Sequence, residues 1–435
     1  MSVPNSRKRR ELPIEVLRYR DYRLLWAGSF ISIFGTQMHA AALYWQIYQI
    51  TGSAFQLGLL GLVRAIALIC TSLIGGVVVD SRDRRKLMLR TQSILLFLSG
   101  SLALATWLDV VNVGMIYVVA AAVAVVSSFD QPARQAILPA LVPREKLSSA
   151  MSLNILSSNV GMMVGPAVGG LAIATIGLAG TYAIDSLTFL GTITALLLMR
   201  TKFEVPVMRL KGFAAAREGL HFIKVTPVIY GVMLIDFSAT LLGSMIGLAP
   251  IFVDRVFNSG PETYGLLLAA PAAGSVIGAA MMSLAPQVTR PGRVIIGAVV
   301  AYGLFLVLFG LSPSIWLAMG CLAGAGFSDA VSMTMRHTVR LLATPDALRG
   351  RVAATHSAFS AGGPRLGEFQ AGMTASLIGP QGAMIFGGSA VILATLCIAK
   401  LVPHIRTYEL SDGPQGPDAA GDTSTTERQT VAASD

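Results

Sequence analysis

The sequence predicts an all-α membrane protein whose twelve transmembrane helices form two six-helix bundles. Three observations lead to this prediction. Of the 435 residues, 54% are hydrophobic and only 13% are charged, whereas soluble proteins carry roughly 25% charged residues. The apolar residues gather in stretches of about 20, the length of a helix that crosses a bilayer. The second half of the chain also repeats the spacing of the first half.

Twelve stretches are long and apolar enough to span a bilayer, and none alternates polar and apolar residues as barrel strands do. The first is too long for the core of a signal peptide and has no obvious cleavage site, so we expect it to be retained. The twelve stretches lie at about 24–49, 56–79, 87–107, 113–130, 150–175, 180–199, 226–252, 262–285, 293–311, 314–335, 353–377 and 381–402.

The same composition argues against several other classes of protein. Cys70, Cys321 and Cys397 each lie in an apolar run and give neither a disulfide framework nor a metal-ligand spacing. The net charge of +10 reflects membrane topology rather than a nucleic-acid partner. No His-Glu-x-x-His, Gly-x-Ser-x-Gly or nucleotide-binding loop occurs. The sequence therefore indicates neither an enzyme nor an ATPase, and we expect no metal or cofactor.

Basic residues predict the orientation in the membrane. Thirty of the 33 Lys and Arg residues lie in segments on one side of the predicted bilayer, and only Arg255 lies on the other side. Basic residues concentrate on the cytoplasmic side of membrane proteins. We therefore expect a multi-pass protein of the plasma membrane (the inner membrane of a bacterium) with both termini in the cytoplasm.

An internal repeat divides the chain. A shift of 202 residues carries Arg134 onto Arg336 and aligns the glycines of the fifth span with those of the eleventh. Such a duplication is typical of transporters whose halves rock around a central site. The predicted parts are a cytoplasmic N-terminal segment, a six-helix bundle, a cytoplasmic linker with a short amphipathic helix, a second bundle and a partly disordered cytoplasmic tail, at 1–23, 24–199, 200–225, 226–402 and 403–435.

The loop between the second and third spans carries a recognisable motif. It reads Gly75-Gly76-Val-Val-Val-Asp80-Ser81-Arg82-Asp83-Arg84-Arg85-Lys86. It resembles the signature loop of the major facilitator superfamily, in which the acidic residue helps to latch the cytoplasmic gate. The matching residues are Gly76, Asp80, Arg84 and Arg85, whereas Ser81 and Asp83 replace a basic residue and a glycine. The alternative is that these basic residues only anchor the topology.

Small residues recur at every fourth position of the fifth span. The pattern is Gly161-x3-Gly165-Pro166-x2-Gly169-Gly170. Small residues at this spacing let helices approach closely, and a proline kinks a helix. The pattern resembles the antiporter motif of facilitator-family exporters, which implies export. Ordinary glycine-mediated helix packing is the alternative.

Further segments narrow the resemblance to the enterobactin-exporter branch of this superfamily, over residues of about 15–405. They are Arg20-Asp-Tyr-Arg-Leu-Leu-Trp26, Pro132-Ala-Arg134, Ala216-Arg-Glu-Gly-Leu220 and Leu348-Arg-Gly-Arg-Val352. The resemblance implies proton-driven efflux of a siderophore or drug-like molecule by alternating access. We expect a small-molecule cargo, protons and the bilayer as partners, no nucleic acid, and a monomer. The alternatives are an importer, a non-transporting sensor and a membrane-embedded enzyme.

Ionisable residues inside the spans are candidates for function, because a charge in the bilayer is costly. Asp236 lies near the middle of the seventh span, Glu368 of the eleventh and His39 of the first. We expect proton uptake at Asp236 or Glu368, with His39 as a proton relay or a packing residue. Alternatively, Glu368 forms a permanent structural ion pair with Arg365, which lies three residues earlier on the same helix face.

Cargo contacts are expected from two arginines and two glutamines. Arg64 and Arg365 suit an anionic cargo, although Arg64 can equally snorkel to the interface. The amides of Gln37 and Gln46 would be unsatisfied in lipid and should face the interior. Structural roles are expected for the two remaining intramembrane acids, Asp185 and Asp329.

Overall fold

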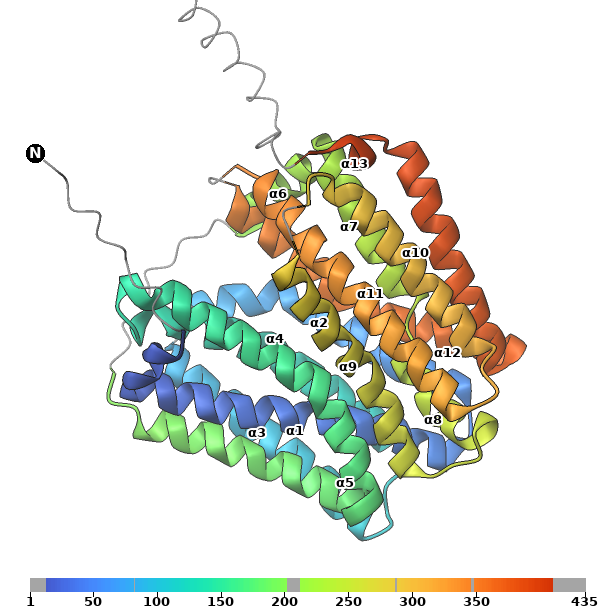
Figure 1. Cartoon of the computed structure of the whole chain (residues 1–435). Helices are drawn as coiled ribbons and strands as arrows, with labels where there is room; N and C mark the ends of the chain where they lie inside the picture. The colour runs from blue at the N-terminus through green and yellow to red at the C-terminus, as the bar shows by residue number, and fades with distance from the viewer. Residues whose placement is uncertain (1–12, 82, 202–211, 286–287, 346–347, 410–435) are drawn as a thin grey trace, which may run out of the picture. The chain divides into compact units, whose positions relative to one another are not determined.

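The computed structural model describes residues 13–81, 83–201, 212–285, 288–345 and 348–409, and all regular structure in these ranges is helical (Figure 1). The predicted all-α fold is confirmed. Within the described part of the chain, nine helical segments are long and apolar enough to cross a membrane. Residues 202–211 of the predicted linker and the predicted tail from residue 410 onward lie outside these residues.

Two helices are about twice as long as a bilayer requires. They are α5 (Leu147–Leu198) and α12 (Arg349–Leu401), and each contains two of the predicted spans. A glycine breaks each one, Gly177 with φ 74° and ψ 179° and Gly379 with φ 79° and ψ 166°. Only glycine adopts this conformation readily. The two breaks are 202 residues apart, which is the shift of the internal repeat.

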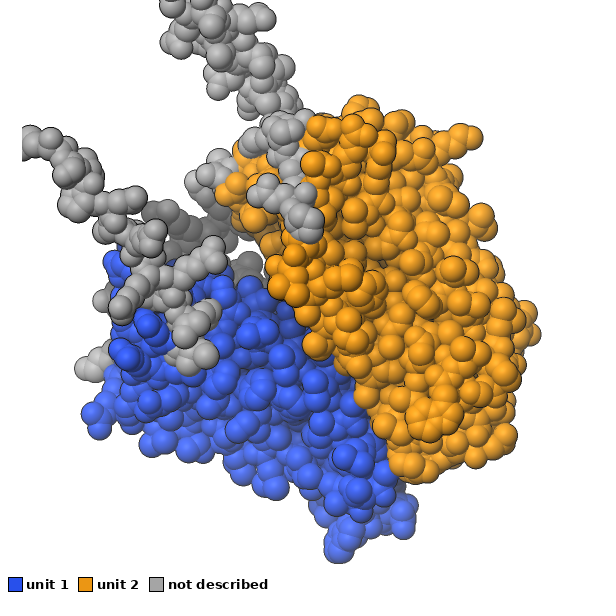
Figure 2. Space-filling view, in the orientation of Figure 1, with its two compact units in different colours: residues 1–46, 67–209 blue, residues 47–66, 210–435 orange. Residues whose placement is uncertain are grey.

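The chain forms two compact units: unit 1 is 1–46 with 67–209, and unit 2 is 47–66 with 210–435 (Figure 2). The end of α1 (Arg20–Thr51) and the beginning of α2 (Ala54–Ser81) thus associate with unit 2, whereas the sequence groups them with the first bundle. The beginning of α2 crosses α12 closely. A Cβ atom at Gly372 would lie only 2.5 Å from the Cα atom of Gly58.

In unit 1, α3 (Arg84–Trp107) packs against both α4 (Val113–Ile137) and α5. Asp83, the residue that departs from the signature loop, caps α3. Its Oδ1 atom accepts hydrogen bonds of 3.0 and 3.2 Å from the backbone N–H groups of Arg85 and Lys86. A carboxylate in this place satisfies amides that a helix leaves unpaired, so Asp83 defines where the third span begins.

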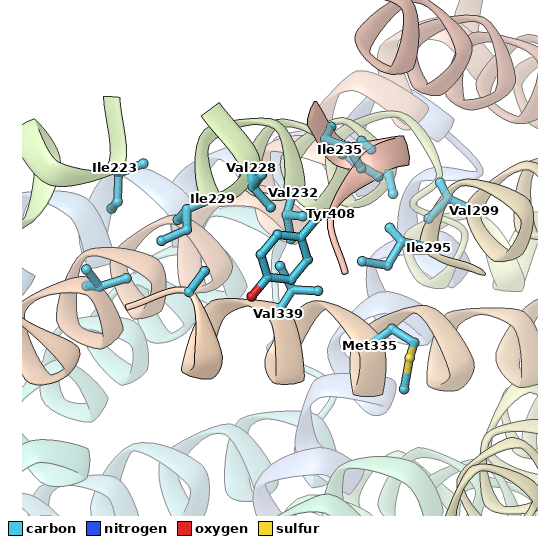
Figure 3. Close-up of a cluster of buried hydrophobic side chains, with 14 of the residues drawn as sticks. Ile223, Val228, Ile229, Val232, Ile235, Ile295, Val299, Met335, Val339 and Tyr408 are labelled. Carbon is cyan, nitrogen blue, oxygen red and sulfur yellow. The ribbon is translucent and has the colours of Figure 1, made fainter. Parts of the chain in front are cut away.

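In unit 2, α11 packs against α9 and α10, and α12 packs against α6, α7 and α10. A hydrophobic cluster joins these helices, and Figure 3 shows Tyr408 among Val232, Val339 and their neighbours. The predicted amphipathic helix is present as α6, and it contributes Phe222 and Ile223 to the cluster. The bounds are α6 (Gly212–Val225), α7 (Pro227–Leu242), α8 (Ala249–Ile251), α9 (Pro261–Leu284), α10 (Pro291–Gly310), α11 (Ile315–Leu342) and α13 (His404–Thr407).

The seventh predicted span, at about 226–252, is not one continuous helix in the structure. The α-helix ends at Leu242, and short helical turns follow as far as Val256. Tyr302 occupies the space beside Gly243 and donates a hydrogen bond of 2.8 Å to its carbonyl oxygen. A side chain from α10 therefore stabilises the break.

Candidate functional site

Asp236 on α7 is the centre of a charge network in unit 2. Its Oδ1 atom lies 3.1 Å from Nη1 of Arg336 on α11, and its Oδ2 atom lies 3.0 Å from Nε2 of His356 on α12. Nη2 of Arg336 also donates a hydrogen bond of 3.1 Å to Oδ1 of Asp329. Three helices thus bring a carboxylate, a permanent cation and a titratable imidazole together.

The two carboxylates of this network lie in different surroundings. The Asp236 side chain is 18% exposed and that of Arg336 only 6%, whereas the Asp329 side chain is 50% exposed. Coulomb attraction is stronger where water is excluded. The contact of Arg336 with Asp236 is therefore more sensitive to a change of charge than its contact with Asp329. A proton on Asp236 removes this attraction and weakens the tie between α7 and α11.

The sequence predicts a functional role for Asp236 but for neither of its partners. Arg336 follows the predicted tenth span, which ends at 335, and so is expected in a cytoplasmic loop, whereas α11 continues to Leu342. His356 lies inside the predicted eleventh span, so the rule applied to the other intramembrane ionisable residues would have found it.

A second polar network lies in unit 1 around His39. Nδ1 of His39 on α1 is 3.0 Å from Oδ2 of Asp185 on α5. The Ser99 hydroxyl on α3 donates a hydrogen bond of 2.6 Å to the same carboxylate oxygen and lies 3.2 Å from His39 Nδ1. All three residues are buried, with exposed fractions of 1–3%. Three helices therefore meet at one imidazole–carboxylate pair.

Gln46 extends this network along α1. Tyr182 on α5 donates a hydrogen bond of 2.8 Å from its hydroxyl to Oε1 of Gln46, and Nε2 of Gln46 donates one of 3.0 Å to Thr106 Oγ1 on α3. The ring of Tyr182 also stands edge-on to His39, with 5.1 Å between centroids. Both ends of the Gln46 amide are thus bound to neighbouring helices, and its expected contact with cargo stays a prediction.

The glycines of the fifth span face α1. A Cβ atom at Gly161 would lie 2.3 Å from Ile33, and one at Gly165 would lie 2.5 Å from Gln37. One at Gly169 would lie 2.8 Å from Met38. Pro166 lies between them inside α5, and Gly170 is buried. The motif therefore forms a close crossing of α5 and α1, at which Gln37 lies.

Glu368 and Arg365 lie where α12 meets α2. The Glu368 residue is only 8% exposed, and a Cβ atom at Gly61 would lie 3.0 Å from its Oε2 atom and 2.7 Å from the carbonyl oxygen of Arg365. Arg64 follows one turn later on α2 and is half-buried. The proton-binding and cargo-binding roles expected of these residues stay predictions.

The arginines of the signature loop bind the ends of other helices in unit 1. Arg84 donates a hydrogen bond of 2.8 Å to the carbonyl oxygen of Ala136, at the end of α4, and Arg85 donates one of 3.2 Å to that of Leu197, at the end of α5. Cations at helix C-termini are favourable because the last carbonyl groups are unpaired. The side chain of Asp80 and the surroundings of Gly76, both in α2, lie outside what the structure describes.

Comparison with known proteins agrees with the helical architecture. A family model of major facilitator type, described as transmembrane secretion effector, matches residues 13–415. The enterobactin exporter EntS of Shigella boydii is 27% identical over 387 residues, which cover 89% of this chain and 93% of the relative. The EntS protein of Escherichia coli O1:K1 is 26% identical with the same coverage.

Solved structures share the fold at low sequence identity. A bacterial homologue of the lysosomal transporter Spinster, inward-facing and occupied, has a TM-score of 0.70 at 17% identity and covers 92% of this chain and 99% of that chain. The nucleoside transporter NupG has a TM-score of 0.72 at 10% identity, with coverages of 88% and 99%. These likenesses concern the fold alone.

Proposed function

Because the chain belongs to the transmembrane secretion effector family of the major facilitator superfamily, we propose that it exports a small organic molecule across the plasma membrane in exchange for protons. The cargo is a catecholate siderophore or a drug-like compound, and both termini lie in the cytoplasm. Similarity to the enterobactin exporters supports the direction and the siderophore class. The antiporter-like glycines at the crossing of α1 and α5 also support export.

The observation that carries the proposal is the position of Asp236 between Arg336 and His356. When Asp236 is ionised, its attraction to Arg336 holds α7 against α11. When it binds a proton from outside, that attraction is lost and the two helices can separate. Release of the proton to the cytoplasm restores the contact. A carboxylate that ties two helices only when it is ionised therefore couples proton movement to conformational change.

The test uses the purified protein in liposomes with an imposed pH gradient. Iron-free enterobactin and a lipophilic dye are followed in parallel, and each is assayed again after the gradient is collapsed. We expect gradient-dependent movement of enterobactin. Dye movement alone would make the protein a multidrug pump, and movement of either compound without dependence on the gradient would overturn proton coupling. Movement of neither would overturn both proposed cargo classes.

A further inference from the structure

Unit 1 contains a buried imidazole–carboxylate pair of its own. We propose that the pair of His39 and Asp185 carries a proton in each transport cycle, in addition to the one carried by Asp236. This inference rests on the proposed proton-driven export and extends it to the proton stoichiometry. Three properties of the pair support it: the chemistry of its counter-ion, its unpartnered atoms and its position between three helices.

The counter-ion is the first property. Asp236 faces the imidazole of His356 and also Arg336, whose guanidinium keeps its charge at every physiological pH. Among the described residues, the cation that pairs with Asp185 is His39, and no Lys or Arg does so. An imidazole gains and loses its charge near neutral pH. The net charge of the site in unit 1 therefore changes by one whenever the pair binds or releases a proton.

The unpartnered atoms are the second property. His39 Nε2 and Asp185 Oδ1 are buried, and neither has a hydrogen-bond partner among the described residues. Leaving buried polar atoms unpaired is costly, so a purely structural pair would be expected to satisfy them. Each of these atoms can bind a proton, or accept a hydrogen bond from a water molecule that delivers one. Asp185 Oδ1 lies close to Gly35 of α1, because a Cβ atom added at Gly35 would be 2.7 Å from this oxygen.

The surroundings are the third property. The groups that face the pair are the Ser99 hydroxyl from α3 and the Tyr182 ring from α5. Ser99 can rotate its hydroxyl to donate to an ionised carboxylate or to accept from a protonated imidazole. A charge that appears or disappears in this buried place changes how strongly α1, α3 and α5 are held together. The pair can therefore transmit its protonation state to the α1–α5 crossing.

The experiment counts protons per cargo molecule. Proteoliposomes are held at a fixed membrane potential with potassium and valinomycin, an internal pH indicator reports proton movement, and iron-free enterobactin is the transported probe. The variants are Asp185→Asn and His39→Gln. Ser99→Ala is the matched control, because it removes a hydrogen bond to the same carboxylate oxygen without removing a titratable group.

We expect Asp185→Asn and His39→Gln each to move one proton fewer per enterobactin than the wild type, and Ser99→Ala to keep the wild-type ratio even where it slows transport. A wild-type ratio in both His39→Gln and Asp185→Asn would overturn the inference and leave the proposed function intact. Wild-type protein that moves enterobactin without protons would overturn the proposed function itself.

A second measurement distinguishes loss of proton coupling from loss of the fold, because only a folded variant exchanges cargo. Exchange of labelled for unlabelled enterobactin at equal pH on both sides requires no net proton movement. His39→Gln should retain this exchange but change its dependence on pH, because the titratable partner of Asp185 is gone. An unchanged pH profile in His39→Gln would contradict the proposed site.

Discussion

Arg134 and Arg336 occupy equivalent positions in the two halves of the chain, yet they bind carboxylates in different places. Arg134 pairs at 2.9 Å with Asp130, one turn earlier on its own helix, whereas Arg336 reaches Asp236 on another helix at 3.1 Å. The repeat shift of 202 residues places Phe34 where the second half has Asp236. Because Arg134 pairs within its own helix, it makes, among the described residues, no ion pair between helices like the one that joins Arg336 to Asp236.

Replacing Asp236 tests the importance of this tie. We expect Asp236→Asn to lower pH-gradient-driven export by about tenfold or more, because the proton-dependent charge disappears. Membrane insertion should be retained, since the amide occupies the same space. Transport in proteoliposomes is the measurement. The matched control is Asp329→Asn, which removes the more exposed partner of the same arginine. Such a contact is worth about 0–1 kcal/mol, so its effect should be small. Normal transport by Asp236→Asn would remove Asp236 from the mechanism.

The two helix breaks predict a backbone-specific loss of stability. Gly177→Ala and Gly379→Ala should each destabilise the protein by about 1–3 kcal/mol, because alanine does not readily adopt the conformation of these residues. Thermal unfolding in detergent measures the change. Gly191→Ala is the control, since Gly191 lies in a regular part of α5 with open space around it. There alanine should be neutral or stabilising by about 0.5–1 kcal/mol. Equal melting temperatures in all three variants would contradict this explanation.

The glycine crossing of α2 and α12 should not tolerate a side chain. A methyl group at Gly372 would collide with the backbone of Gly58, so Gly372→Ala should weaken this contact and lower the melting temperature. Gly350→Ala, also on α12 but with no atom within 4 Å of the added Cβ, should have no such effect. A melting temperature of Gly372→Ala equal to that of the control would show that the helices can separate here without cost.

Asp21 should make stability depend on pH at the acidic end. Burial raises the pKa of its carboxyl, but hydrogen bonds from Thr201 Oγ1, Thr201 N–H and Arg200 N–H outweigh burial and lower the pKa below its ordinary value. A lowered pKa means that the ionised form stabilises the folded state. This contribution is complete above the unfolded pKa of about 3.9 and is lost as the pH falls through the lower folded value.

The corresponding measurement compares melting temperatures at several pH values. Wild-type protein should melt above Asp21→Asn at pH 7, and the difference should shrink below a pH of about 4. Asp109→Asn is a suitable control because Asp109 is exposed. A difference between wild type and Asp21→Asn that does not vary with pH would assign the effect to packing rather than to the charge.

The sequence by itself determined the helical membrane fold, the internal repeat and the candidate residue Asp236. These depend on local properties: the length of apolar runs, the spacing of glycines and the cost of a charge in a bilayer. Gly177 and Gly379 are separated by the shift of the same repeat, because a duplicated chain turns at duplicated positions.

Only the tertiary structure decided which charges meet. In the sequence Asp236 has no basic neighbour within a helical turn, but Arg336 lies 100 residues later and His356 lies 120 residues later, and helix packing brings both to its carboxylate. Asp185 is likewise distant from His39 in the chain. Side-chain pairing between helices depends on how each helix is rotated and where it ends. Those properties arise from the packing of many residues at once, as at Gly372 against Gly58, and no short motif encodes them.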